Sequence, residues 1–474
     1  MAGEIDSATF VVVGGGIAGV SCVEGLSFLC PERRIILITA SPFVKTVTNI
    51  IPLTKMLTQF DVEEKDAEAL SAAHPSLSVI HDSVVKLDSA DHTIITRDGR
   101  YIQYEKLCIC TGAYPKVIAE GNPYVIGIRD TESVRDFEKR IATARKILVV
   151  GNGGIATEVV HELEGIEIVW AIKDKHISAT FIDPGAAEFF LSQLQKDKPK
   201  KPVSTVKRLK YTASPGKDGE GHGAALGPDW HANINLSRTQ SNKSKVSIEY
   251  ECEVKKVLDS KDMHSIGEDW PVYAELTNGK IVGCDFIVSA TGVIPNSSMF
   301  VDGNDLELSA DGGIKVNWLM ETSVQDVFAA GDVCTASWEH ARHWFQMRLW
   351  TQARQMGMYA AKTMVGSYKN EEVYQDFCFE LFSHVTNFFG FKVVLLGLFN
   401  GQKLNGEYEI LLRVSRGMEY VKLVMRDGKL EGAVLIGETD LEEMCENLIL
   451  DQLDLSIYGE DLLNPEIDVD DYFD

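Results

Sequence analysis

The 474-residue sequence contains no long apolar run and no apolar leader at its start. A membrane-spanning helix needs roughly 20 consecutive apolar residues, and no stretch of this sequence approaches that length. Only nine residues precede the first apolar run, Phe10 to Val13, and glycines follow that run at once, which is not the pattern of a secretory signal. The sequence therefore predicts a soluble intracellular protein.

Basic residues are scarce relative to acidic ones, since 46 Lys and Arg stand against 70 Asp and Glu, and the formal net charge is -24. A surface this acidic repels a nucleic-acid backbone, so broad nucleic-acid binding is not expected. The nine cysteines form no C-x-x-C motif and no metal-ligand cluster. This cysteine usage predicts a reducing compartment and no metal site.

Glycine-rich loops occur twice, each directly after a short apolar run that predicts a buried strand. The first loop is Gly14-Gly15-Gly16-Ile17-Ala18-Gly19, and the second is Gly151-Asn152-Gly153-Gly154-Ile155-Ala156. In a strand, turn and helix, such glycines let the backbone approach a pyrophosphate, and the helix N-terminus supplies N–H groups. One such loop is a weak signal. Two loops predict two dinucleotides, and an enzyme that holds two dinucleotides most often passes a hydride between them.

Further motifs follow the loops in a fixed order. Thr111-Gly112 ends one apolar strand, Thr291-Gly292 ends another, and Gly331-Asp332 follows the run Val327 to Ala330. This order resembles the two-dinucleotide-binding flavoprotein family, whose relatives include glutathione reductase, NADH oxidase and rubredoxin reductase. The resemblance spans residues 10 to 332 and implies an α/β fold with two Rossmann-like domains, one for FAD and one for NADH or NADPH.

The resemblance assigns site residues by position. Those implied for FAD are Gly14, Gly16, Ile17, Ala18, Gly19, Thr111, Gly112, Gly331 and Asp332, with Asp332 accepting a ribityl hydroxyl. Those implied for the nicotinamide dinucleotide and the joint between the domains are Gly151, Gly153, Gly154, Ala156, Thr291 and Gly292.

Both strands that usually end in an acid lack one. Thr39 and Ser41 stand where the family places an acid for the FAD ribose, and a hydroxyl there binds more weakly than a carboxylate. The second strand ends at Lys173, which with Lys175 favours NADPH, whereas Asp174 between them favours NADH. The choice between NADH and NADPH stays open.

A narrower resemblance covers nearly the whole chain, including the stretches GNPYVIGIRDT, MRLWTQARQMG and the tail YGEDLLNPEIDVDDYFD. These segments are similar to a eukaryotic member of the same family. That resemblance implies a flavoprotein of cytoplasm and nucleus that is associated with protecting a tRNA-splicing RNA ligase from oxidation. Neither composition nor spacing points to that partner.

The expected domain order is discontinuous. Residues 1–114 and 296–370 would form the FAD domain, 115–295 the NAD(P) domain and 371–474 a small mixed α/β C-terminal domain with an acidic tail. Residues 183–245 are rich in Lys, Gly, Ser and Pro and predict a polar, basic, partly disordered insertion. Asp427-Gly428 between two apolar-rich runs predicts a hairpin. The insertion and the tail are either solvated segments or docking sites for a partner.

The redox cysteine pair of the disulphide reductases is missing. No cysteine occurs between Cys30 and Cys108, although the family often carries C-x-x-x-x-C on a helix near residues 43–60. The sequence therefore predicts an FAD-dependent NAD(P)H oxidoreductase whose acceptor needs no thiol relay, such as oxygen, a quinone or a partner redox centre. The alternative is a flavin-holding, redox-slow interaction protein whose nucleotide state controls docking.

Three further residues are candidates beside the flavin. In relatives, a lysine at the position of Lys45 faces the flavin and pairs with a glutamate at the position of Glu158. A buried pair of this kind would hold a positive charge that favours the anionic reduced flavin; the alternative is a lysine and a glutamate that both face water. The helix that begins near Trp350 resembles the one that meets the flavin pyrimidine edge in relatives, and Trp350 is either a flavin contact or a core residue.

Overall fold

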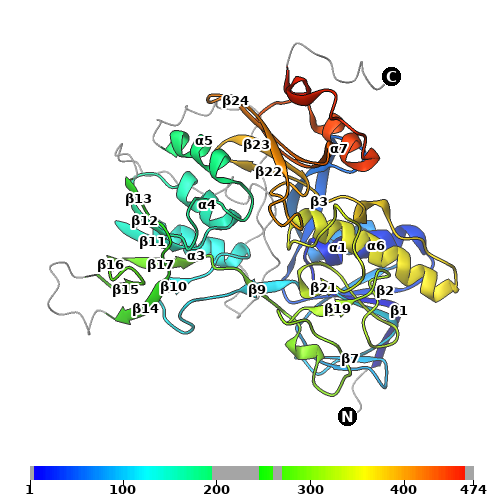
Figure 1. Cartoon of the computed structure of the whole chain (residues 1–474). Coiled ribbons are helices and arrows are strands. Elements are labelled where there is room, and N and C mark those ends of the chain that lie inside the picture. Colours follow the sequence, from blue (N-terminus) through cyan, green and yellow to red (C-terminus); the bar gives the residue numbers. More distant parts are fainter. Residues whose placement is uncertain (1–4, 195–244, 260–269, 465–474) are drawn as a thin grey trace.

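The computed structural model describes residues 5–194, 245–259 and 270–464. Figure 1 shows three units: a blue and yellow N-terminal unit, a cyan and green middle unit, and an orange and red C-terminal unit. Among the described residues, no helix combines the length and the apolar character needed to cross a membrane.

The N-terminal unit is built on a seven-stranded, mainly parallel sheet. Its strands, in spatial order, are β5 (Leu77–His81), β2 (Ile35–Thr39), β1 (Ile5–Val13), β8 (Tyr101–Ile109), β7 (Thr93–Thr96) and β6 (Val84–Asp88), and β20 (Val327–Ala329) also pairs with β8. The central strands β1 and β2 are almost fully buried because apolar residues fill both faces, as in other parallel sheets that helices cover.

Helices α1 (Ile17–Leu29) and α6 (Trp350–Lys369) pack side by side against this sheet. A Cβ atom on Gly357 of α6 would lie 2.2 Å from the Ala18 carbonyl oxygen of α1. Only glycine allows this helix crossing to be so close, so the N-terminal turn of α1 and the middle of α6 form one rigid support.

The middle unit has a second parallel sheet of five strands. The strands, in spatial order, are β10 (Val125–Ile126), β17 (Phe286–Ser289), β11 (Lys146–Val150), β12 (Glu167–Ala171) and β13 (Lys245–Glu249). Helices α3 (Thr131–Ile141) and α4 (Gly154–Glu162) pack with its core, and the antiparallel strands β14 (Val254–Asp259), β15 (Val272–Leu276) and β16 (Ile281–Cys284) form a separate small sheet. The predicted fold class, with two Rossmann-like sheets, is confirmed.

Two short strands connect these units. Strand β9 (Ala113–Pro115) leaves the first sheet and pairs antiparallel with β18 (Val293–Pro295), which returns from the second. The Thr111 hydroxyl donates to the Asn296 carbonyl at 2.7 Å, and the Thr291 hydroxyl donates to the Lys116 carbonyl at 2.8 Å. Each threonine therefore ties one crossing chain to the other.

The expected insertion begins later than residue 183. Residues Pro184–Leu194 form helix α5, and Ala186, Ala187 and Phe190 on that helix are buried in the core of the middle unit. The apolar residues of this stretch recur at helical spacing, and the polar composition of the residues that follow obscured that pattern. Residues 195–244 of the insertion, like the tail 465–474, lie outside the described residues.

The C-terminal unit is a five-stranded antiparallel sheet covered by helix α7 (Glu442–Asp451). Its strands, in spatial order, are β22 (Ser383–Phe388), β23 (Phe391–Gly397), β26 (Lys429–Ile436), β25 (Glu419–Arg426) and β24 (Glu409–Ser415). Asp427 and Gly428 both have positive φ, 52° and 73°, and link β25 to β26. The predicted Asp-Gly hairpin is confirmed.

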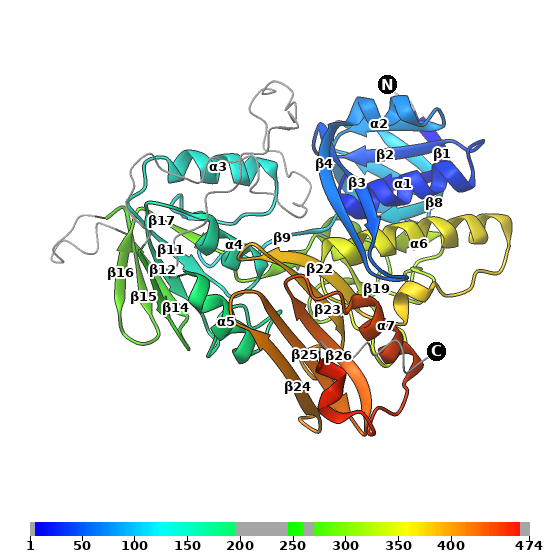
Figure 2. The same cartoon turned by 90° about the horizontal axis from the view of Figure 1, so that it is seen from above.

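A long hairpin occupies the segment in which the resemblance led us to expect a helix with two cysteines. It consists of β3 (Phe43–Pro52) and β4 (Thr58–Asp66). Figure 2 shows this blue hairpin extending from the first sheet toward the red helix α7. Its tip is buried there, since Met56 and Leu57 belong to the apolar core of the C-terminal unit.

Candidate functional site

The first glycine loop makes a turn that side chains would block. Gly14 has φ of 119°, and a Cβ atom on it would lie 2.2 Å from the Cys110 carbonyl oxygen at the end of β8. A Cβ atom on Gly19 would lie 1.9 Å from the Gly14 carbonyl oxygen. Helix α1 starts at Ile17, and its N-cap residue Gly16 has no side chain to occupy the terminal N–H groups. The loop therefore presents bare backbone at a helix N-terminus, as anion binding requires.

The second loop repeats this construction. Gly151 has φ of 126°, and a Cβ atom on it would lie 2.1 Å from the Ala290 carbonyl oxygen at the end of β17. Gly153 is the N-cap of α4, again without a side-chain cap, and a Cβ atom on it would meet nothing within 4 Å. Ala156 is fully buried where the first loop has Gly19. The two loops thus form equivalent turns on two separate sheets.

The Gly331-Asp332 segment lies against the first loop. A Cβ atom on Gly331, which has φ of 80°, would lie 2.7 Å from the Cβ atom of Ala18. Asp332 accepts a hydrogen bond from Arg129 Nη2 at 2.7 Å, and Arg129 Nε donates to the Ala113 carbonyl at 2.9 Å. Arg129 therefore connects Asp332 to the strand that joins the two sheets.

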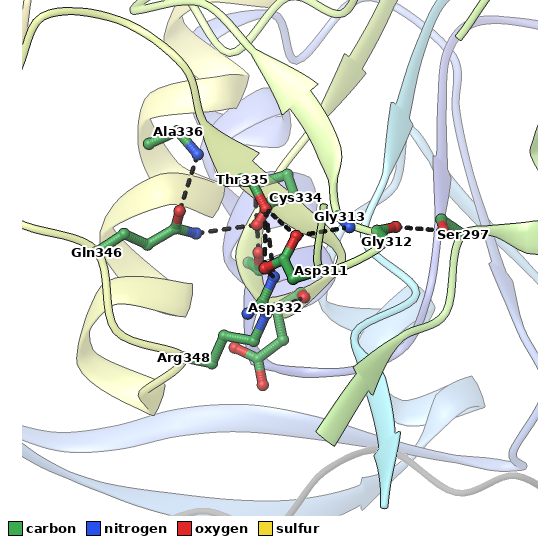
Figure 3. A network of polar contacts seen from close by, with 11 residues as sticks. Ser297, Asp311, Gly312, Gly313, Asp332, Cys334, Thr335, Ala336, Gln346 and Arg348 are labelled. Atoms are coloured by element: carbon green, nitrogen blue, oxygen red, sulfur yellow. Dashed lines mark hydrogen bonds and ion pairs between the residues drawn. The ribbon is translucent and has the colours of Figure 1, made fainter. Parts of the chain in front are cut away.

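A polar network fixes the backbone around Asp332, as Figure 3 shows. Arg348 Nε donates to the Asp332 carbonyl at 2.8 Å, and Arg348 Nη2 donates to Asp311 at 2.7 Å. Burial raises the pKa of Asp311, but the hydrogen bonds from Arg348, the Gly313 N–H and Thr335, together with the charge of Arg348, outweigh burial, and the net pKa is lowered. Gln346 bridges the Cys334 carbonyl and the Ala336 N–H. These contacts hold the segment rigid beside α1.

The strand end expected to carry an acid carries hydroxyls that serve the local turn. Thr39 ends β2 and is 2% exposed. Its hydroxyl donates to the Ser41 carbonyl at 3.0 Å, and the Ser41 hydroxyl accepts from the Phe43 N–H at 3.2 Å. A Cβ atom on Gly15 would lie 2.5 Å from the Thr39 hydroxyl oxygen, so Thr39 directly adjoins the first glycine loop.

Lys45 is buried beside the same loop, but its partner differs from the one expected. Its backbone N–H donates to the Gly15 carbonyl at 2.9 Å, and its side chain is paired with Glu64 at 2.7 Å. Thr131 at the start of α3 accepts a further bond from the Lys45 ammonium at 2.9 Å. Lys45 therefore pairs with Glu64, which the hairpin places directly across from it, whereas the sequence analysis expected Glu158 as the partner.

The electrostatic balance at Lys45 is that of a buried ion pair. Burial raises the pKa of Glu64, yet the charge of Lys45 and its hydrogen bond outweigh burial, and the net pKa is lowered. Glu132, next to Thr131, has its pKa raised by burial and by the nearby charges of Asp130 and Glu64. The Oε1 atom of Glu64 and the Oε2 atom of Glu132 are buried without a hydrogen-bond partner in the part of the chain that the structure describes.

Trp350 begins α6 and lies where the three units meet. Its ring centroid is 5.1 Å from that of His384 on β22, and Phe181 of the middle unit stacks on the same histidine at 6.4 Å. Thr351 Oγ1 lies 3.0 Å from His384 Nδ1. Burial lowers the pKa of His384 to about 3, so this histidine is neutral at physiological pH.

The cysteines nearest the first loop are packed as apolar filler. Cys108 and Cys110 lie 3.5 Å apart between their sulfur atoms, on the same side of the strand end. The hydrogen bond with Cys108 and burial raise the pKa of Cys110, and burial raises the pKa of Cys334. A buried thiol with a raised pKa is a poor nucleophile.

Comparison with known proteins identifies the family. The family model described as pyridine nucleotide-disulphide oxidoreductase matches residues 8–198 and 233–357, which is more than half of the sequence. The chain belongs to this oxidoreductase family. The match spans both glycine loops, the two threonine-glycine segments and Gly331-Asp332.

Relatives within and beyond the oxidoreductase family agree with this assignment. The chain is 52% identical to the Pongo abelii protein named pyridine nucleotide-disulfide oxidoreductase domain-containing protein 1, over 98% of each sequence. The eukaryotic resemblance predicted from the sequence is thereby confirmed. A ferredoxin reductase from Rhodopseudomonas palustris superposes with a TM-score of 0.64 at 18% identity and covers 90% of this chain and 91% of that one. An engineered water-forming NADPH oxidase gives 0.66 at 15% identity and covers 94% and 92%. At these identities the two structures show a shared fold.

Several residues that shape this oxidoreductase site escaped the sequence analysis. Arg129 was visible within the quoted GIRDT stretch, but a buried partner for Asp332 cannot be inferred from spacing. The sequence did not indicate Glu64 as the partner of Lys45, because its segment was compared with a cysteine-bearing helix and was not interpreted as a hairpin. Lys173, which the sequence analysis proposed as a nucleotide-binding residue, is exposed at the surface.

The residues at the first loop fit the flavin dinucleotide that the family carries. Gly14, Gly19 and Gly331 each pack where a Cβ atom would clash with the protein, and the N-cap Gly16 leaves the first N–H groups of α1 without a side-chain partner, as a pyrophosphate site requires. Asp332 supplies an acceptor for a hydroxyl, and Arg129 and Lys45 supply cations. The second loop offers the same phosphate cradle without an equivalent of Asp332.

Proposed function

We propose that the chain is an FAD-dependent NAD(P)H oxidoreductase that transfers a hydride from nicotinamide to flavin. The pair of equivalent glycine turns carries this proposal, because Gly14 and Gly151 make the same close approach to a carbonyl oxygen on separate sheets. Family membership and the full-length relative support it. In such a protein the flavin accepts the hydride and the nicotinamide donates it, so the chain has to bind, align and shield the two carriers.

The described side chains have definite tasks in this proposal. Asp332 would accept a hydrogen bond from a hydroxyl of the flavin's ribityl chain. Arg129, which also donates to the Ala113 carbonyl at the joint between the sheets, fixes the orientation of the Asp332 carboxylate. Lys45 holds a positive charge beside the first loop, where negative charge on a reduced flavin would be stabilised. Glu64 fixes the Lys45 side chain through a 2.7 Å ion pair, so the charge is positioned before any ligand binds.

The acceptor that we propose is not a disulphide. The hairpin Phe43–Pro52 and Thr58–Asp66 occupies the position of the cysteine-bearing helix and has no thiol. Among the cysteines, Cys378 alone is partly exposed and the other eight are buried. Oxygen, a quinone or a partner redox centre remains as acceptor. The similar folds include a ferredoxin reductase and a water-forming NADPH oxidase, whose names indicate a protein acceptor in one case and oxygen in the other.

A second function is favoured by the same lack of a thiol relay. The chain would hold reduced flavin with slow turnover, and its nucleotide state would control docking to a partner such as a tRNA-splicing RNA ligase in cytoplasm and nucleus. The acidic tail and the basic insertion are the segments proposed for docking. This partner is proposed from the resemblance described in the sequence analysis alone.

Reoxidation kinetics distinguish these functions. The protein is reduced with one equivalent of NADH or NADPH without oxygen and then mixed with oxygen, with a quinone or with buffer, while the flavin absorbance is followed. Return of the oxidised flavin within the time of turnover, with one of the two acceptors, supports the oxidoreductase. Stable reduced flavin with both acceptors supports either the interaction protein or an oxidoreductase whose acceptor is a partner redox centre. Prior alkylation of accessible thiols is expected to change none of these rates, and a large loss of rate would contradict a thiol-independent acceptor.

A further inference from the structure

Asn152 links the second glycine loop to the segment that follows the neighbouring strand. It lies between the two glycines of the turn and is 6% exposed. Its Nδ2 atom donates to Asp174 Oδ2 at 2.8 Å and to the His176 carbonyl at 2.9 Å. Its Oδ1 atom accepts from the Ser178 N–H at 2.5 Å. One buried amide therefore fixes the loop to three residues beyond the end of β12.

Asp174 is held where an adenosine ribose is recognised in this type of fold. Strands β11 and β12 are parallel neighbours in register from Lys146↔Glu167 to Val150↔Ala171, so the loop and Asp174 emerge at the same sheet edge. An acidic side chain about 20 residues after the glycine loop hydrogen-bonds the ribose 2′-hydroxyl in the general Rossmann arrangement. Asp174 follows the loop at about that spacing, although it lies beyond the strand end rather than on it.

The Asp174 carboxylate has capacity left for a ligand. Asn152 occupies Oδ2, and the Asp174 carbonyl accepts from the Glu251 N–H at 3.2 Å, which anchors the backbone. No other side chain of the described segments donates to the Asp174 carboxylate, so Oδ1 remains open. A hydrogen bond to a carboxylate is roughly twice as strong as a neutral one, and its orientation here is set in advance.

The side chains of the lysines on either side of Asp174 are not fixed by comparable contacts. Lys173 and Lys175 are both exposed, and neither ammonium has an ion pair or hydrogen bond with the residues that the structure describes. Exposed cations attract a phosphate weakly because water screens them and their side chains lose freedom on binding. A 2′-phosphate would place two negative charges beside the fixed carboxylate, so repulsion outweighs the lysines.

We propose that Asn152 is a positioning residue that holds Asp174 to bind the adenosine ribose 2′-hydroxyl, so that the second loop prefers NADH to NADPH. This inference rests on the proposed function, because it concerns the dinucleotide of the same site. It assigns recognition of the ribose 2′ position to Asp174 and the positioning of Asp174 to Asn152. The two exposed lysines then modify the preference without setting its direction.

Binding of two ribose fragments tests this inference without flavin chemistry. Calorimetric titration of the full chain with ADP-ribose and with 2′-phospho-ADP-ribose gives a ratio of dissociation constants. The unphosphorylated fragment is expected to bind about tenfold more tightly or better, the factor that 1.4 kcal/mol represents. Asp174→Asn removes the charge and is expected to bring the ratio close to one.

Asn152→Ala is expected to reduce the ratio in the same direction while the chain stays folded. A purely structural role would weaken both fragments equally and leave the ratio unchanged, which would overturn the positioning role. Lys173→Ala serves as the matched control and is expected to preserve the preference. Equal binding of both fragments to the unmodified chain, or tighter binding of the phosphorylated one, would overturn the inference but not the proposed function. If neither fragment bound, both the inference and the proposed function would be overturned.

Discussion

Gly14 and Gly151 hold the same position relative to their sheets, and each excludes a side chain for the same reason. Their φ angles are 119° and 126°, and a Cβ atom would lie 2.2 Å or 2.1 Å from the carbonyl oxygen that ends the neighbouring strand. A methyl group at either position forces the loop away from that strand. In the proposed function, the N–H groups of each loop bind the phosphates of one dinucleotide. The substitution should therefore weaken binding of the dinucleotide at that loop and leave the other dinucleotide bound.

Alanine at each glycine is therefore expected to remove a different cofactor. The Gly14→Ala protein is expected to contain little flavin after purification and still to bind ADP-ribose at the second loop. Gly151→Ala is expected to stay yellow but to be reduced by NADH or NADPH at least about tenfold more slowly at a fixed concentration, as a loss of about 1.4 kcal/mol in binding implies. Flavin released by heat and the rate of anaerobic bleaching measure the two effects.

A third glycine controls for strain without a clash. Gly99 also has a positive φ of 80°, but a Cβ atom there would meet nothing within 4 Å. Gly99→Ala is expected to cost roughly 1–2 kcal/mol of stability through backbone strain and to leave both cofactors in place. If the alanines at 14 and 151 abolish the same ligand, the two loops do not serve two dinucleotides.

Single residues differ in how far the sequence reveals them. The glycines of both loops could be predicted because a turn of this kind admits no other residue, and the motif repeats. The partner of Lys45 could not, because Glu64 faces it only through the pairing register of β3 and β4. Arg129 reaches Asp332 across 203 residues of sequence, a separation over which no local pattern carries information.

At the scale of elements, the β3–β4 hairpin is the largest departure from expectation. The β-branched residues of Phe43–Pro52 favour a strand, and the opposing strand Thr58–Asp66 pairs with it. The comparison with a cysteine-bearing helix concerned missing thiols, so the strand-favouring residues of this segment were not interpreted as a hairpin. Helix α5 was missed for a related reason, because eleven residues of helix precede a polar segment whose composition dominated the prediction.

The hairpin tip also joins the N-terminal and C-terminal units. Glu446 of α7 is fully buried and accepts hydrogen bonds from the Thr54 hydroxyl and, at 3.2 Å, from the Met56 N–H. Met56 and Leu57 of the same tip pack in the C-terminal core. This buried carboxylate therefore adds hydrogen bonds to a joint in which Met56 and Leu57 supply apolar packing.

Glu446→Ala is expected to weaken that joint by roughly 1–3 kcal/mol, because the Met56 N–H stays buried without an acceptor. Thermal unfolding followed by circular dichroism should show a lower midpoint, while flavin content in the folded protein is unchanged. Glu443 on the same helix is exposed, and Glu443→Ala is expected to change stability by no more than about 0.5 kcal/mol. An unchanged midpoint for Glu446→Ala would show that the joint does not depend on this carboxylate.

At the scale of the whole molecule, the three units meet around the candidate flavin site. His384 of β22 contacts both Trp350 of α6 and Phe181 of the middle unit. Phe389 at the next turn packs on His161 of α4 and stacks on Phe190 of α5, with ring centroids 4.8 Å apart in both cases. The C-terminal unit is thus in contact with both of the units that carry a glycine loop.

The division into two Rossmann-like sheets could be predicted from the sequence, because each sheet begins with its own loop and the connecting segments repeat. The docking of the C-terminal unit could not be predicted. Its contacts with the middle unit include an ion pair between Lys422 and Asp183 at 2.6 Å, both mostly buried and 239 residues apart. The aromatic residues that accompany this pair, such as Phe389, have no periodic pattern that identifies their partners.

Anaerobic mixing of the flavin-loaded protein with NADH, and separately with NADPH, tests the central claim most directly. The flavin absorbance is recorded together with the oxidised nicotinamide formed. The account predicts that the flavin band bleaches, that one nicotinamide is oxidised for each flavin reduced, and that NADH acts at lower concentration than NADPH. A protein that holds flavin and binds either nucleotide, yet leaves the flavin oxidised, would contradict hydride transfer between the two sites.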